Sequence, residues 1–164
     1  MLENGSLLEH YGKLKRLEKL LELNLSVLEE LEEILLENLE ELEEYLLLLD
    51  EEERVFAEKL RASIRTILKH LDGLKRKTES DWEKVEFTIL KLCVRREPVN
   101  IGELSENYLY EFYHKLEVLR DYIDLHRELF AEELQKYNLF DKFPADVYIG
   151  FLEKLTEFNS QFRR

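Results

Sequence analysis

Apolar positions repeat with helical spacing from the start of the chain. Leucine recurs every seven residues along the N-terminal third, at Leu7, Leu14, Leu21, Leu28, Leu35, Leu42 and Leu49. A seven-residue apolar repeat keeps one seam of an α-helix against a partner helix. The positions three residues further on hold Leu17, Asn24, Leu31, Asn38 and Tyr45, and a buried Asn in such a seam fixes register. The pattern predicts a helix designed to pack against other helices.

Helical spacing continues along the rest of the chain, and no long segment alternates with the period of two typical of strands. A Ser, Asp or Asn with Glu three residues later caps free backbone N–H groups and marks helix starts. Such pairs begin at Ser6, Ser26, Asp50, Ser80 and Asn100. We therefore expect an all-α bundle of about five helices, over residues 7–49, 51–77, 81–96, 101–138 and 144–162. A break near Asn24 would turn the long first helix into a helical hairpin.

The two halves of the chain differ in composition. Residues 1–50 hold 19 leucines and two aromatic residues, whereas most aromatic residues lie after residue 107. Leucine stripes suit helix seams, and aromatic side chains suit an irregular core. The sequence predicts an acidic, leucine-rich, coiled-coil-like helix over residues 1–50, part of which could project as an arm. A compact helical body over residues 51–164 would complete one continuous domain.

Charge is unevenly distributed around a net value of −13. Residues 1–53 carry 17 acids and four bases, whereas residues 54–96 carry six acids and 12 bases. An antiparallel hairpin of the first helix on the second would set acid against base; a basic protein partner or self-association is the alternative. A nucleic-acid partner is disfavoured by the overall negative charge. The abundance of Glu and Lys leans towards a thermophile.

Motifs for localisation and cofactors are few. The single Cys93 fits a reducing cytoplasm. The longest apolar run, residues 46–49, is far too short to cross a bilayer, so we expect a cytoplasmic protein without a membrane partner. Scattered histidines give no metal site, and no glycine-rich phosphate loop is present. We expect no cofactor.

One short motif resembles the HEPN group of RNA-cleaving helical bundles. In that group four to six residues separate an Arg from a following His, and Arg120 and His126 have this spacing, as do Arg65 and His70. The resemblance implies that Arg120 stabilises the phosphate and His126 acts in acid–base cleavage of RNA. His126 also falls on the apolar stripe of its predicted helix, where a core histidine with one hydrogen bond is the alternative interpretation.

Residues 85–120 resemble a helix-turn-helix regulator. Residues 88–92 and 97–104 are similar to the first two helices of a winged-helix domain, with Arg95 and Arg96 adding positive charge. The resemblance implies DNA binding by a following recognition helix.

An aromatic cluster, Tyr108, Tyr110, Phe112 and Tyr113, covers more than one face of its predicted helix. Some of these rings would anchor a partner, or the last helix would cover them. We therefore expect a non-enzymatic interaction or scaffold protein, a subunit or adaptor of an assembly or a self-associating bundle. Its contact residues would be the seam positions Leu14, Leu21, Leu28, Leu35, Leu42, Leu49, Asn24 and Asn38, with the tyrosines 108, 110 and 113.

Overall fold

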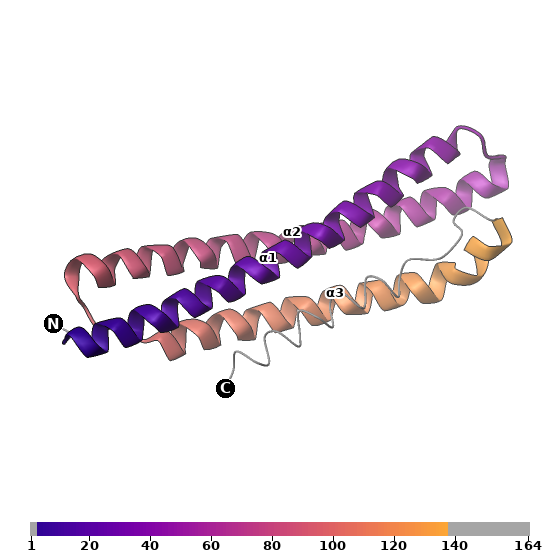
Figure 1. Ribbon diagram of the computed structural model, residues 1–164. Coiled ribbons are helices and arrows are strands. Elements are labelled where there is room, and N and C mark those ends of the chain that lie inside the picture. The colour runs from indigo at the N-terminus through magenta and orange to yellow at the C-terminus, as the bar shows by residue number, and fades with distance from the viewer. Residues whose placement is uncertain (1–2, 138–164) are drawn as a thin grey trace.

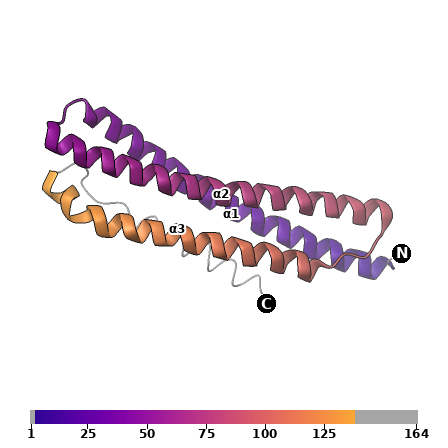
Figure 2. The ribbon, with the colours of Figure 1, turned by 180° about the vertical axis from the view of Figure 1, so that it is seen from behind.

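Three long helices lie side by side (Figure 1). The computed structural model describes residues 3–137, and the side chains of residues 3–130 except Tyr45. Helix α1 spans Asn4–Leu46, α2 spans Glu51–Arg95 and α3 spans Ile101–Tyr137. Two short turns connect them, so α2 runs antiparallel to both neighbours, as the view from behind in Figure 2 also shows. The all-α prediction is confirmed, while the helix predicted over 144–162 lies outside the described residues.

The predicted number of helices was too high in the middle of the chain. Residues 51–77 and 81–96 belong to one helix, and Ser80 lies within it, exposed. The reason is tertiary packing. The buried stripe of α2 passes through this region at Leu71, Leu74, Thr78, Asp81 and Val85 without a change of phase. Both halves pack on the same core, and this overrides the local start signal at Ser80.

Two of the predicted capping pairs do begin helices. The Asp50 side chain accepts a hydrogen bond of 2.8 Å from the backbone N–H of Glu53 at the start of α2. Asn100 accepts the equivalent bond from Glu103 at 3.0 Å and donates to the Glu103 carboxylate at 3.2 Å. Ser6 and Ser26 instead lie inside α1, which continues past Asn24 without a break.

The core lies along the shared axis of the three helices. Leucines from both seam positions of α1 pack against apolar residues of α2 and α3, including Leu60, Ile67, Leu71, Phe112 and Leu119. Burial of each such side chain contributes roughly 1.5–3 kcal/mol. The leucine helix is thus a structural third of this bundle along its whole length.

Opposite charges face each other between α1 and α2, as expected from the antiparallel pairing of the first helix with the second. Glu43 of α1 lies 3.0 Å from Arg65 and 3.8 Å from Arg61, and Glu32 lies 3.3 Å from Lys75. These pairs are partly exposed, so each contributes at most about 1 kcal/mol. They fix the antiparallel orientation more than they stabilise it.

Candidate interaction surfaces

The leucine seam lies inside the chain's own bundle. Leu14, Leu21, Leu28, Leu35 and Leu42 are fully buried, while Leu49 is partly buried at the turn after α1. Of the two seam asparagines, Asn24 is fully buried and Asn38 is half-buried. In this conformation the five fully buried leucines pack against α2 and α3, and no surface of these five remains for a second protein.

A hydrogen bond joins α1 to α3 inside the apolar core. The Asn24 side chain donates through Nδ2 to the hydroxyl of Tyr108 over 2.9 Å. Thr78 of α2 is also buried near this hydroxyl, and its own hydroxyl donates to the Leu74 carbonyl over 3.0 Å. Burial raises the pKa of Tyr108 well above its usual range, so it stays protonated. One buried residue from each helix therefore meets at this level, which fits a device that fixes register.

Charged side chains extend this polar layer to the surface between α2 and α3. The Lys77 ammonium lies 2.7 Å from Asp81 and 2.9 Å from Glu111. Burial alone would lower the pKa of Lys77, but the hydrogen bonds to these two carboxylates raise it overall. The same contact lowers the pKa of Glu111. Lys84 lies 3.6 Å from Asp81, so two ammonium groups meet two carboxylates, and the cluster offers a ligand little net charge.

The aromatic cluster divides between core and surface. Tyr108 and Phe112 are buried, with ring centroids 5.4 Å apart. Tyr113 is half-buried, with its ring edge-on to Phe112 at 6.2 Å. Tyr110 points outward and is 77% exposed. Of the three tyrosines predicted to contact a partner, Tyr110 alone presents most of its ring to solvent.

His126 occupies the position of a core histidine. It is 1% exposed, its Nδ1 lies 2.6 Å from Ser63 Oγ, and its ring packs on Phe130 with centroids 5.1 Å apart. Burial lowers its pKa to about 4. Arg120 is half-buried on the same helix, and six residues of α-helix turn its side chain well away from His126. RNA could reach this imidazole only after the helices separated.

The region that resembles a helix-turn-helix has a different geometry. Residues 85–95 are the last turns of the 45-residue helix α2. From Ile101 the chain forms one continuous helix to Tyr137. The short second helix expected over 97–104 is therefore not formed, because residues 101–104 are the first turn of α3. Within residues 3–137 no separate recognition helix follows.

An apolar stripe on the outer face of α2, which sequence analysis missed, lies opposite the core. Phe87, Leu90 and Val94 are 62%, 59% and 72% exposed. Their spacing of three and four residues places them on one face. We call these three residues the α2 strip. Exposed residues of both charges lie close to it on the same helix, among them Glu83, Glu86, Arg95 and, just after the helix, Arg96.

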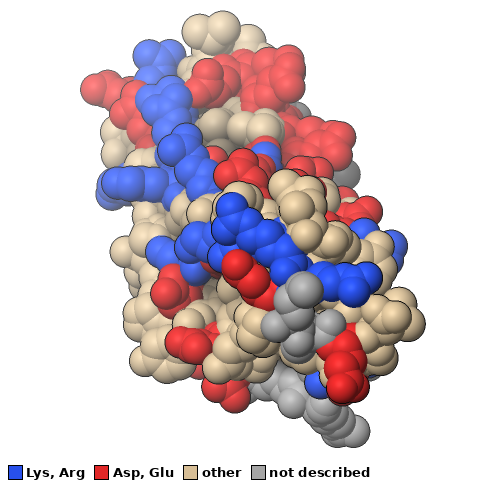
Figure 3. Space-filling view, turned by 90° about the vertical axis from the view of Figure 1, so that its left-hand side faces the viewer, with Lys and Arg blue, Asp and Glu red and all other residues tan. Residues whose placement is uncertain are grey.

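Several cations at this end of the bundle lack an ion-pair partner or contact an aromatic ring. Arg16, Arg95 and Arg96 are exposed and belong to none of the ion pairs among residues 3–130. Lys91 lies over the Phe87 ring at 5.9 Å from its centroid. Figure 3 looks onto this end of the molecule, where Lys and Arg form a band between acidic groups and uncharged surface.

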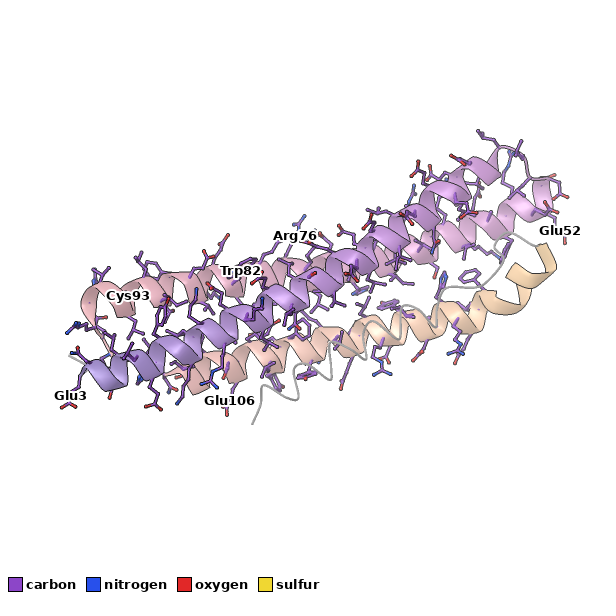
Figure 4. All side chains as sticks on the ribbon, in the orientation of Figure 1. Glu3, Glu52, Arg76, Trp82, Cys93 and Glu106 are labelled. Carbon is purple, nitrogen blue, oxygen red and sulfur yellow. The ribbon has the colours of Figure 1, made fainter. Side chains whose placement is uncertain are left out.

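The opposite end of the bundle is acidic. Leu47 and Leu48 at the turn between α1 and α2 are 84% and 82% exposed, and Val55 is half-exposed. We call these three residues the acidic tip, because Glu40, Glu41, Glu44, Glu51 and Glu52 around them are all exposed. Figure 4 shows the separation: Cys93 and Glu3 mark one end of the bundle, and Glu52 marks the other.

Sequence signals for both ends existed. The three apolar residues of α2 break the polar face of an amphipathic helix, and the run at residues 46–49 exceeds what a turn requires. Neither signal could be assigned to an exposed end of the bundle without knowing that α1 and α2 pair along their length.

Metal-ligand clusters, membrane-spanning helices and related proteins give no further indication of function for the described residues. Among the described residues, no cluster of three or more His, Cys, Asp or Glu could hold a metal ion. None of the three helices is apolar over a stretch long enough to cross a membrane. No protein-family model, curated protein or solved structure matches this chain. The exposed apolar side chains at the two ends of the bundle therefore remain as the candidate functional surfaces.

Proposed function

We propose that this chain is a non-enzymatic helical association protein, a subunit, adaptor or self-associating scaffold, whose contact surfaces are the two ends of the rod. The observation that carries the proposal is the exposure of large apolar side chains at those ends. Clustered, exposed apolar side chains mark sites of association more often than isolated ones. The leucine seam supplies the rigid body that holds the two ends apart.

The two polar sites that could have carried a reaction or bound a ligand also favour association over catalysis. His126, the histidine proposed to act in a ribonuclease motif, is buried against Ser63 and Phe130. The ion cluster around Lys77 is internally neutralised. By contrast, the side chains at the ends are positioned by helices and already exposed, so they can bind without unfolding.

Crosslinking in cells tests this function. The tagged wild-type chain would be compared with the variant Leu90→Ser/Val94→Ser, with the variant Leu47→Ser/Leu48→Ser and with a control. Leu36→Ser is the matched control, because Leu36 is half-exposed within α1, about 15 Å along the helix from its end. We expect crosslinked species containing another protein or a second copy, lost in at least one end variant and kept in the control. No specific crosslinked species with the wild type would contradict the proposal.

A further inference from the structure

We infer that the chain forms an exchanged dimer, in which the turn between α1 and α2 opens and α1 of each copy packs on α2 and α3 of the other. This dimer rests on the proposed association function: a second copy is the partner, and the acidic tip is the hinge. Two observations carry it, namely the contrast between the two turns of the bundle and the phase of the apolar stripes around the first turn.

The turn between α2 and α3 contains signals that end one helix and start another. Arg96 has a φ of 56°, and its N–H donates to the Leu92 carbonyl over 2.9 Å. Pro98 follows, and proline cannot continue a helix. Asn100 then caps α3. The sequence itself therefore specifies a chain reversal at this turn.

The turn between α1 and α2 contains far weaker signals. Residues 47–50 are three leucines and an aspartate, and none of them has a positive φ. Leucine is a strong helix former. The last turn of α1 carries Glu43 and Glu44 and no basic residue, although negative charge is unfavourable at the C-terminal end of a helix. The Asp50 cap on Glu53 is the signal that starts α2 here, and nothing in residues 47–49 prevents a continuous helix.

The apolar stripes of α1 and α2 are in phase across this turn. When α1 is continued at about 100° per residue, four apolar residues lie within about 20° of one another around the helix axis: Leu42, Leu49, Leu60 and Ile67. All four belong to the core or pack against it. A hairpin does not require this agreement, because each of its helices can rotate separately about its own axis. A straight helix through the turn would therefore keep one unbroken apolar face.

The contacts of α1 select a second copy as the partner. In the exchanged dimer each α1 meets the same surfaces of α2 and α3 that it covers in the single chain. Its polar contacts form again between copies, including Asn24 with Tyr108 and Glu43 with Arg65. A straight helix over residues 4–95 would be about 138 Å long at 1.5 Å per residue. The exchange is mutual, so it closes at two copies.

The opened turns add one new contact at the centre of the dimer. The two long helices run antiparallel, so their hinges lie side by side. Leu47 and Leu48, which are 84% and 82% exposed in the hairpin, can bury apolar surface there. The same arrangement brings the exposed Glu44, Glu51 and Glu52 of both copies together. Added salt should therefore strengthen the dimer, since it screens repulsion between exposed charges.

Two substitutions in the hinge act in opposite directions. Asp50→Ala removes a cap that the hairpin alone uses, so it should favour the dimer by roughly tenfold. Leu48→Pro should abolish the dimer, because proline disrupts a helix interior. The hairpin tolerates it, because Leu48 is exposed and lies two residues after α1, where proline is common. Asn100→Ala is the matched control: it removes the cap at the other turn, where Pro98 prevents a continuous helix.

Solution mass by light scattering, after refolding from urea at increasing protein concentration, gives the decisive readout. We expect the wild type to form a species of twice the 19.9 kDa of one copy, and no larger one. Its fraction should rise with added salt and in Asp50→Ala. It should be unchanged in Asn100→Ala and lost in Leu48→Pro, with the helical circular dichroism of Leu48→Pro close to that of the wild type.

Three outcomes would overturn the exchange: a wild type that stays monomeric at every concentration, a dimer that persists in folded Leu48→Pro, or equal effects of Asp50→Ala and Asn100→Ala. If Leu48→Pro does not fold, the comparison of the two cap variants decides alone. A monomeric wild type that still crosslinks to another protein in cells would overturn the exchange and leave the association function standing.

Discussion

At the scale of single residues, Arg96 holds a backbone conformation that arginine disfavours. It follows the last residue of α2 with a φ of 56°, and its N–H donates to the Leu92 carbonyl over 2.9 Å. Glycine commonly ends helices in this left-handed region, where other residues have a cost of roughly 1–2 kcal/mol. Glycine loses more entropy on folding, by about 0.4–1 kcal/mol. We therefore expect Arg96→Gly to raise the free energy of unfolding by about 0.5–1 kcal/mol in urea denaturation.

The neighbouring residue supplies the control. Arg95 is the last residue of α2 and has helical backbone angles. Arg95→Gly removes a similar charge but places glycine inside the helix, so it should lower stability by up to about 1 kcal/mol. A stabilising Arg95→Gly, or a destabilising Arg96→Gly, would show that the positive φ at residue 96 is not a source of strain.

His126 makes stability depend on pH. Its pKa is about 4 in the folded chain and about 6.5 when unfolded, because burial disfavours the charged imidazole. Between these values the unfolded state binds more protons, so the stability contribution is complete above about pH 6.5 and is lost as the pH falls towards 4. The full shift corresponds to about 3 kcal/mol. In His126→Gln this contribution is absent, so the stability of the wild type relative to the variant should fall between pH 7 and 4. Carboxylates shared by both proteins cancel in that difference, and a difference independent of pH would contradict the assignment.

At the scale of elements, Ser80 tests whether α2 is one helix or two. An exposed serine inside a helix is replaced by alanine with a gain of about 0.5 kcal/mol. A serine that caps a helix start loses about 1 kcal/mol on the same change. The structure places Ser80 inside α2, so we expect Ser80→Ala to raise the midpoint of urea unfolding slightly. A clear decrease would instead indicate a helix boundary at this residue. Asp50→Ala, at a true cap, should show that decrease.

The polar layer joins α1 to α3 through a single hydroxyl. Tyr108→Phe removes the acceptor of the Asn24 side chain while leaving the ring in the core. A buried donor that loses its partner costs about 1–3 kcal/mol. We expect thermal unfolding to report a loss of that size. Tyr110→Phe deletes the same hydroxyl from an exposed ring on the same helix, and should change stability by a few tenths of a kcal/mol at most. Equal effects of the two changes would mean that the buried hydrogen bond contributes little.

Elements with a long uninterrupted pattern were predictable, and those decided by tertiary packing were not. The heptad leucines correctly predicted α1 as one helix, and Asn100 marked the start of α3. The start signal at Ser80 failed because Thr78, Asp81 and Val85 are held by other helices. The identity of the helix that packs against the leucine seam could not be predicted from the sequence either. A heptad pattern is the same whether the facing helix belongs to the same chain or another, and the acid–base pairing of α1 with α2 gave only a preference.

At the scale of the whole molecule, three helices of similar length make a rod in place of a compact body with an arm. The 45 residues of α2 span about 67 Å at 1.5 Å per residue, and α1 and α3 run beside it (Figures 1 and 2). A rod of this kind separates its two ends by nearly its full length. Charged groups at one end therefore have little effect on those at the other, since the distance far exceeds the screening length of about 8–10 Å in physiological salt.

The rod shape is measurable by small-angle X-ray scattering. A compact chain of 164 residues would have a radius of gyration of about 15 Å. A rod about 67 Å long has a radius of gyration of at least about 19 Å, its length divided by the square root of 12. We expect about 20 Å for the chain at concentrations where its scattering mass is that of one copy. A value near 15 Å at that mass would mean that the helices fold back on themselves, and the two ends would then lie close together.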